Sequence, residues 1–183
     1  EISPRRAEIA AWRNKDCANL RICVGNLNDL ALGASYDVVT LIGVLEYAVS
    51  FTHTQAPFHD FLVQCQQYLK PGGRLVIALE NRLGMKYWSG AREDHTGKMY
   101  DGILGYPGVR HVRTFSRQEL AQLLTGAGFA GQQWYYPYPD YKFPMELHTD
   151  RRLPTAEELR GSINEAYDCE RLEIFPEKEA FAS

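Results

Sequence analysis

YDVVTLIG at residues 36–43 and RLVIALEN at residues 74–81 are the two stretches that decide the fold of this chain. Both are largely apolar and β-branched with polar residues mainly at their ends, a pattern typical of strands buried on both faces of a sheet. Between them an apolar stripe predicts a helix over about 58–69, formed by Phe58, Phe61, Leu62, Cys65 and Leu69. Strand, helix and strand in this order predict an α/β protein with a mainly parallel sheet and helices on both faces. Such sheets bind ligands at the carboxyl ends of their strands.

Upstream and downstream of this unit the sequence predicts further elements. Ser3-Pro4 is typical of a helix start, and the helix is expected to end near residue 13 or 14. A short apolar strand is predicted at 20–24, and a later strand at about 131–136. Two capping boxes, Ser116 with Glu119 and Thr155 with Glu158, predict two more helix starts. Residues 82–112 break the rhythm with glycines and few aliphatics, and we interpret them as a long insertion that can act as a lid.

The composition is that of an ordinary globular protein. The chain has 183 residues, 45% of them hydrophobic and 23% charged, which excludes collagen-like and globally disordered classes. The net charge of −3 is carried by residues 151–183, so no basic excess supports nucleic-acid binding. No apolar run approaches the length of a membrane span and no leader opens the chain, so we expect a cytoplasmic protein without a membrane span.

Cysteine and histidine spacing gives no metal signature. The four cysteines lack CxxC or zinc-ligand spacing, and we expect free, mostly buried thiols. The five histidines are scattered without an HExxH motif, so we expect no bound metal. We divide the chain into a domain at 1–150, containing the insertion, and an acidic helical tail of the same domain at 151–183.

A family resemblance is carried by the motifs around the two strands. YDVVTLIGVLEY at 36–47 followed by YLKPGGRLVI at 68–77 resembles the fourth strand, following helix and fifth strand of class I S-adenosylmethionine-dependent methyltransferases. TFSRQEL at 114–120, continuing to AGF at 127–129, resembles a later helix of that family, and Glu1-Ile2-Ser3 resembles the end of its second strand. The similarity covers roughly residues 1–136. It implies a Rossmann-like fold.

The same comparison shows a departure at the N-terminus. The family's first strand and glycine-rich loop precede its second strand, and this chain contains no GxGxG. GxGxxG at Gly126, Gly128 and Gly131 follows a predicted helix and precedes a strand, so we interpret it as a helix stop rather than a phosphate loop. The domain is therefore expected to be incomplete at its N-terminus. Apolar sheet edges would then be exposed, and association with a second copy is one way to cover them.

The resemblance implies a site for S-adenosylmethionine. Glu1, with Ile2, would end the second strand and bind the ribose, while the alternative for Glu1 is a mobile terminus. Other positions implied to contact the cofactor follow the third and fourth strands: Asn26 and Leu27 at the adenine, the backbone of Gly43, Val44 and Leu45 at the methylsulfonium, and Tyr47 at the pocket wall. Asn26 is alternatively a turn former, and Gly43 alternatively marks a bend.

The acceptor side is predicted at the end of the next strand and in the insertion. Glu80 is a candidate for contacting or deprotonating the acceptor, with a solvated strand-end carboxylate as the alternative. Asn81 is either an acceptor contact or the cap of the following turn. His95 is a candidate base in the insertion, and a solvated loop histidine is the commoner case. The insertion, with Tyr87, Asp101 and Tyr106 as candidate acceptor contacts, resembles bacterial methyltransferase-like proteins that accompany glycosyltransferases.

The function that the sequence favours is methyl transfer from S-adenosylmethionine to a small-molecule or glycan-precursor acceptor. One alternative is a non-catalytic methyltransferase-like scaffold. Another is a nicotinamide-dependent oxidoreductase, because such enzymes share doubly wound sheets and Tyr138 with Lys142 matches a YxxxK pattern. That pair needs a helix, and Pro139 lies between the two residues, so we interpret the match as chance.

Overall fold

A computed structural model describes residues 1–29, 36–138 and 140–158 of the chain. The elements in chain order are α1 (Pro4–Arg13), the 3-10 turn η1 (Leu27–Asp29), β1 (Tyr36–Ile42), the 3-10 turn η2 (Leu45–Tyr47), α2 (Ala48–Phe51), α3 (Pro57–Gln67), β2 (Leu69–Ala78), α4 (Met85–Trp88), α5 (Arg117–Gly126), β3 (Tyr135–Tyr138) and β4 (Glu146–Thr149). The predicted α/β class is confirmed. Among the described residues, no helix is both long and apolar enough to cross a membrane.

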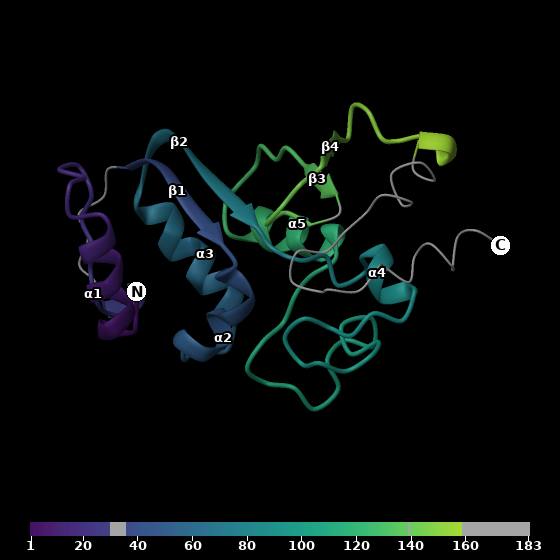
Figure 1. Ribbon diagram of the computed structural model, residues 1–183, viewed down its shortest axis with the longest axis horizontal. Helices are drawn as coiled ribbons and strands as arrows, with labels where there is room; N and C mark the ends of the chain where they lie inside the picture. Colours follow the sequence, from purple (N-terminus) through teal and green to yellow (C-terminus); the bar gives the residue numbers. More distant parts are fainter. Residues whose placement is uncertain (30–35, 139, 159–183) are drawn as a thin grey trace.

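The two decisive stretches form a parallel pair of strands. β1 and β2 pair in register from Val38 opposite Arg74 to Ile42 opposite Ala78, with an irregularity between Tyr36 and Val38. They run side by side and end together in Figure 1, as parallel strands joined by the crossover helix α3 must. A smaller antiparallel sheet is formed by β3 and β4.

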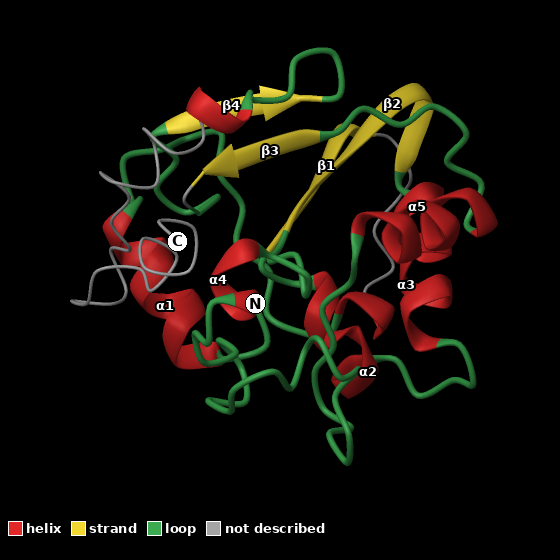
Figure 2. Ribbon diagram, turned by 90° about the vertical axis from the view of Figure 1, so that its right-hand side faces the viewer, coloured by secondary structure: helices red, strands yellow, loops and turns green. Residues whose placement is uncertain are grey.

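One face of the β1–β2 pair forms the core. Leu41 is buried, and Val39, Leu75 and Ile77 on the same face pack against the core cluster. The helices contribute Phe61, Leu62, Cys65, Leu120 and Ala127 to this cluster, and Figure 2 shows α3 and α5 together beside β2. The first four residues of the predicted stripe lie on α3, with Phe61, Leu62 and Cys65 buried, whereas Leu69 is the first residue of β2 because the helix ends at Gln67.

The opposite face of the pair is partly exposed to solvent. Val38 and Ile42 are 52% exposed and Val76 is 45% exposed. These side chains alternate with the buried ones along each strand, as the period of two requires. Since both core-forming helices pack on the other face, no described helix covers this one to the same extent.

Several local predictions are confirmed and others are shifted. Ser3 caps α1, and Ser116 and Glu119 form the reciprocal capping box of α5. The Thr155 N–H likewise donates to the Glu158 carboxylate and the Glu158 N–H to the Thr155 hydroxyl, while the rest of the predicted tail helix lies outside the described residues. Residues 20–24 form no assigned strand, although the N-terminal ammonium donates to the Cys23 carbonyl and Gly25 donates back to Glu1. These few bonds to one neighbour do not make a ladder.

The strand expected at 131–136 begins four residues later as β3, and it contains Pro137 because its only partner in the two-stranded sheet is β4. The thiols also depart in part from expectation. Cys65 is buried, and burial raises the pKa of its thiol to about 11. Cys17 and Cys23 are free but exposed, since they lie outside the core, and Cys169 lies outside the described residues.

Residues 82–112 form a long segment with little regular secondary structure, as the sequence predicts, and α4 is a short helix within it (Figure 1). Its base is held by Arg82. The guanidinium donates to both carboxylate oxygens of Glu119, at 2.7 and 3.2 Å, and to the carbonyls of Gly102 and Ile103. Arg82 therefore fixes the end of the sheet and the insertion to the first turn of α5.

This anchor predicts a pH-dependent stability. Burial alone would raise the pKa of Glu119, but the Arg82 guanidinium and the Ser116 donors outweigh it and lower the pKa from 4.5 to about 2. The stabilisation is therefore complete above about pH 4.5 and is lost as the pH falls toward 2. Glu119→Gln should lower the free energy of unfolding in urea at pH 7, with a smaller difference from wild type at pH 3.

Glu8→Gln on the exposed part of α1 is the control and should change stability little at either pH. A difference between wild type and Glu119→Gln that is constant from pH 7 to 3 would contradict the assignment.

Candidate active site

The candidate site lies where the two parallel strands end. Gly43 follows β1 with φ of 62°, a conformation that favours glycine, and its N–H donates to the Ala78 carbonyl of β2. Glu46 comes next on η2, and Glu80 lies just beyond β2; both side chains are buried. The register of the sheet thus places two carboxylates from different segments at one edge.

His95 joins these carboxylates from the insertion. Its Nε2 lies 3.9 Å from Glu46 Oε1 and 3.9 Å from Glu80 Oε2, and its side chain is only 7% exposed. The ring also packs edge-on against Tyr47, with centroids 5.4 Å apart. His95, Glu46 and Glu80 are hereafter called the strand-end cluster.

Glu93 orients the histidine. One carboxylate oxygen lies 2.8 Å from His95 Nδ1 and accepts from the Tyr106 hydroxyl at 2.9 Å. The other accepts from the backbone N–H groups of His95 and Thr96, both at 2.7 Å. With 1% exposure and four donors, Glu93 holds the turn at 93–96 and aims Nε2 at the cluster.

The charges of this group depend on one another. Burial opposes protonation of His95, but the carboxylates of Glu46 and Glu93 outweigh it and raise its pKa to about 10. Burial likewise opposes ionisation of Glu93, but the hydrogen bonds from His95 and its neighbours lower the pKa of that carboxyl overall. The carboxylates around His95 thus favour its protonated form.

Residues after β3 complete the wall of the site. Lys142 Nζ lies 3.1 Å from Glu80 Oε1. The hydroxyl of Tyr141 stands over Gly43, where an added Cβ would lie 3.1 Å from it, and burial raises the pKa of this phenol. A side chain at position 43 would therefore meet both an unfavourable φ and this hydroxyl.

Two carboxylate oxygens in the cluster are left without hydrogen bonds. Glu46 Oε2 and Glu80 Oε2 are buried and have no hydrogen-bond partner among the described residues. Glu80 Oε2 is also the oxygen that faces His95 Nε2. Unsatisfied buried carboxylate oxygens are costly, so their presence is a common mark of a functional site.

Sequence reasoning found some of this site and missed the rest. It selected Glu80, His95, Gly43 and Tyr47, which the structure brings together. It did not select Glu46, Glu93, Tyr141 or Lys142 for this site. Glu46 stands within the VLEY motif between two selected residues, so its position was a usable signal, whereas nothing along the chain links Tyr141 to Gly43.

The residues predicted to contact the cofactor have different surroundings. Glu1 is exposed, accepts the Ser3 N–H through one carboxylate oxygen, and lies beside Cys23 and Gly25, while Ile2 is 53% exposed. The Asn26 side chain accepts from Asn28 N–H and donates to the Phe51 carbonyl, so it serves as the turn former that was its alternative.

The hydrophobic residues that were predicted to contact the cofactor pack toward the core. Leu27 and Val44 pack against the core, and Leu45 is fully buried. The side chains of Leu27 and Val44 are only partly buried, and the Leu27 carbonyl already accepts from Gln64 and Tyr68.

Two of the predicted acceptor contacts are buried tyrosines. Tyr87 is 1% exposed and donates to Asp94 at 2.6 Å, and Tyr106 is 4% exposed and donates to Glu93. Burial raises the pKa of both phenols. Both hydroxyls are thus engaged in hydrogen bonds inside the insertion.

The remaining two predicted acceptor contacts, Asn81 and Asp101, keep a side chain that is exposed or has an oxygen without a hydrogen-bond partner among the described residues. Asn81 is exposed, although its side chain accepts from the Leu83 N–H as the cap of a turn. Asp101 is buried and its Oδ2 has no hydrogen-bond partner among the described residues.

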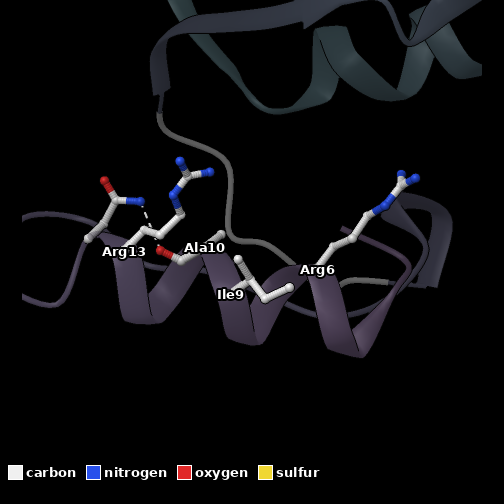
Figure 3. Close-up of a pocket in the computed structure, with 5 residues that line it drawn as sticks. Arg6, Ile9, Ala10 and Arg13 are labelled. Atoms are coloured by element: carbon white, nitrogen blue, oxygen red, sulfur yellow. Dashed lines mark hydrogen bonds between the residues drawn. The ribbon is translucent and has the colours of Figure 1, made fainter.

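A separate surface pocket lies on α1 and is unrelated to the strand ends. Arg6, Ile9, Ala10 and Arg13 line it together with the C-cap residue Asn14 (Figure 3). All of these residues come from one helix and its cap, so the pocket is a groove on the outside of α1. The YxxxK pair also lacks its structural context, because Tyr138 lies in β3 rather than on a helix.

The support of Glu93 generates a stability prediction. Tyr106→Phe keeps the buried ring but removes one donor from a buried carboxylate, and it should lower the free energy of unfolding in urea by about 1–3 kcal/mol. Tyr135→Phe, at a phenol that is 55% exposed, is the matched control and should change it by less than about 0.5 kcal/mol. Equal effects of the two substitutions would contradict the role of Tyr106.

Part of the chain matches a family model, and most of the chain resembles a solved structure in fold. Residues 1–75 match a family model described as a methyltransferase domain. A solved structure from Thermotoga maritima, described as an SAM-dependent methyltransferase and possible histamine N-methyltransferase, is 21% identical with a TM-score of 0.51. The alignment covers 81% of this chain and 64% of that one, so this chain spans less than two thirds of its length. No curated protein sequence matches the chain.

A second solved structure, described as PigF with SAH, is 18% identical with a TM-score of 0.45. It covers 73% of this chain and 37% of its own. The Thermotoga structure confirms the Rossmann-like α/β fold that the sequence predicts.

Proposed function

We propose that this chain transfers a methyl group from S-adenosylmethionine to a small-molecule or glycan-precursor acceptor, and the match of residues 1–75 to a family model described as a methyltransferase domain supports the proposal. The observation that carries the proposal is the meeting of Glu80 and His95 beside Gly43, at the carboxyl ends of the parallel strands. Open α/β sheets bind their ligands at this edge.

The residues at the cofactor end fit part of the cofactor. Gly43 leaves room that a Cβ would fill, and its positive φ turns the backbone toward the site. Glu1 has an exposed carboxylate beside the segment 23–25, suited to accept hydrogen bonds from ribose hydroxyls. S-Adenosylmethionine supplies an electrophilic methyl group on a sulfonium; the chain's part is to bind it and exclude water.

The acceptor end is assigned to the strand-end cluster. Glu80 Oε2, buried and without a hydrogen-bond partner among the described residues, can accept a hydrogen bond or a proton from an acceptor hydroxyl or amine. Protonated His95 donates from Nε2 and orients the acceptor toward the carboxylates. Transfer of a methyl group needs in-line approach more than acid–base strength, so positioning is the main task of these residues.

The acceptor class is inferred from the insertion. Its resemblance to methyltransferase-like proteins that accompany glycosyltransferases supports a sugar-containing acceptor, in the cytoplasm of a bacterium. Asn81 and Asp101 are the side chains that we assign to acceptor binding, because one is exposed and the other has a carboxylate oxygen without a partner among the described residues.

A second candidate function is a scaffold without catalysis. The open face formed by Val38, Ile42 and Val76 favours it, because an exposed apolar sheet face is suited to contact another protein or a second copy. The two functions differ in one cheap measurement, since a scaffold does not need to bind the cofactor.

The test is calorimetric titration of S-adenosylhomocysteine into the chain and two glycine variants. In Gly43→Ala the alanine has to adopt the φ of +62° that Gly43 has in the structure. Its Cβ would lie 3.1 Å from the Tyr141 hydroxyl. We expect saturable binding to wild type and at least about tenfold weaker binding to this variant, a loss of about 1.4 kcal/mol.

Gly72→Ala is the matched control. Its φ is +80°, so it carries a similar backbone cost, but nothing lies within 4 Å of the added Cβ and it stands at the other end of β2. It should bind as wild type does. Absence of saturable binding to the wild-type chain would overturn the enzyme proposal and favour the scaffold.

A further inference from the structure

We propose that the strand-end cluster is a site for one divalent first-row transition cation, with Glu46, Glu80 and His95 as its protein ligands. Within the described part of the chain, these three residues form a group of His and acidic side chains whose candidate ligand atoms all lie within 4.8 Å of one another. The inference goes beyond the proposed function, because it gives Glu80 Oε2 and His95 Nε2 a cation in place of the direct acceptor contacts. Binding of the cation itself can be measured without cofactor or acceptor.

The histidine is oriented as a metal ligand is. Its Nδ1 lies 2.8 Å from Glu93, and its Nε2 faces Glu46 and Glu80. Metal-binding histidines almost always donate their second ring N–H to a carboxylate or carbonyl, which fixes the tautomer and the ring. Glu93 is itself held by Tyr106 and two backbone N–H groups, so this outer support exists before any ion arrives.

The carboxylates have coordination capacity that the protein leaves unused. Glu46 is 2% and Glu80 6% exposed, yet one oxygen of each has no hydrogen-bond partner among the described residues. In Glu80 this oxygen points at His95 Nε2, while its other oxygen is taken by Lys142. A cation can satisfy a buried carboxylate oxygen that accepts no hydrogen bond and faces an imidazole nitrogen.

The local charge also favours a cation. Glu46, Glu80 and Glu93 bring three carboxylates to the site, against Lys142 and the imidazole of His95. When the cation binds, a bond forms to Nε2 and the proton on that nitrogen leaves to solvent, while the Nδ1 proton stays on the Glu93 side. Three negative charges are then balanced by the divalent ion and the lysine.

The spacing indicates the kind of ion. Zinc bonds of about 2.0–2.2 Å place tetrahedral ligand atoms about 3.4 Å apart, so the two 3.9 Å separations need to shorten by about half an ångström. Two carboxylates and one imidazole suit Zn²⁺ and Mn²⁺. No local sequence motif marks this group, because its residues 46, 80 and 95 are brought together only by the fold.

The test is calorimetric titration of MnCl₂ and of ZnCl₂ into the chain, with loss of the free Mn²⁺ electron-spin-resonance signal as a second readout. We expect one-to-one binding that is at least about tenfold weaker in Glu80→Gln and in His95→Gln. His59→Gln, at a histidine paired with Asp60 and outside the cluster, is the control and should bind as wild type does.

Glu93→Gln separates orientation from ligation, because Glu93 is not among the proposed ligands. It should weaken binding about 10- to 100-fold. Circular dichroism and urea unfolding establish that each variant is folded, and Glu46→Gln replaces His95→Gln if that variant is not. Absence of saturable binding of both ions, or wild-type affinity in the folded ligand variants, overturns the inference.

The outcome is distinguishable from that of the proposed function. Saturable binding of S-adenosylhomocysteine without binding of either ion overturns the metal site and leaves methyl transfer standing. Binding of an ion without binding of S-adenosylhomocysteine supports the metal site and overturns the proposal of methyl transfer.

Discussion

The parallel pairing of β1 with β2 is the constraint on which the rest of the structure depends. It brings the ends of two strands to one edge, so Gly43 hydrogen-bonds to Ala78, two residues before Glu80, although the helix α3 separates them in the chain. The same register puts Val39, Leu41, Leu75 and Ile77 on one face, where α3 and α5 complete the core. Without that pairing there would be neither a core face nor a common site.

The insertion is held by polar contacts in addition to its buried apolar side chains. Arg82 fixes its base to α5, and Glu93 collects four donors around one turn. Such networks are strong when every member is satisfied and costly when one partner is removed. This explains how a segment with little regular structure can hold His95 against two buried carboxylates.

The site contains one carboxylate whose hydrogen bonds are all made and two carboxylates that each have an oxygen without one among the described residues. Glu93 has all its neighbours in place, whereas Glu46 and Glu80 each keep an oxygen without a hydrogen bond among the described residues. Natural proteins tolerate such a cost mainly where a ligand relieves it. Both the acceptor proposal and the metal proposal start from this contrast, and they differ in what provides the missing partner.

The sequence by itself determined the elements and their kinds. Apolar periodicity located β1, α3 and β2, and capping residues located the starts of α1 and α5, because these signals are local and act through backbone geometry. The sequence also placed Glu80 and His95 among the candidates. Only the tertiary structure decided that one sheet face is open, that Asn26 and the two tyrosines of the insertion are internally engaged, and that Glu46 and Glu93 meet His95. Those outcomes depend on contacts between segments far apart in the chain, which no local pattern encodes.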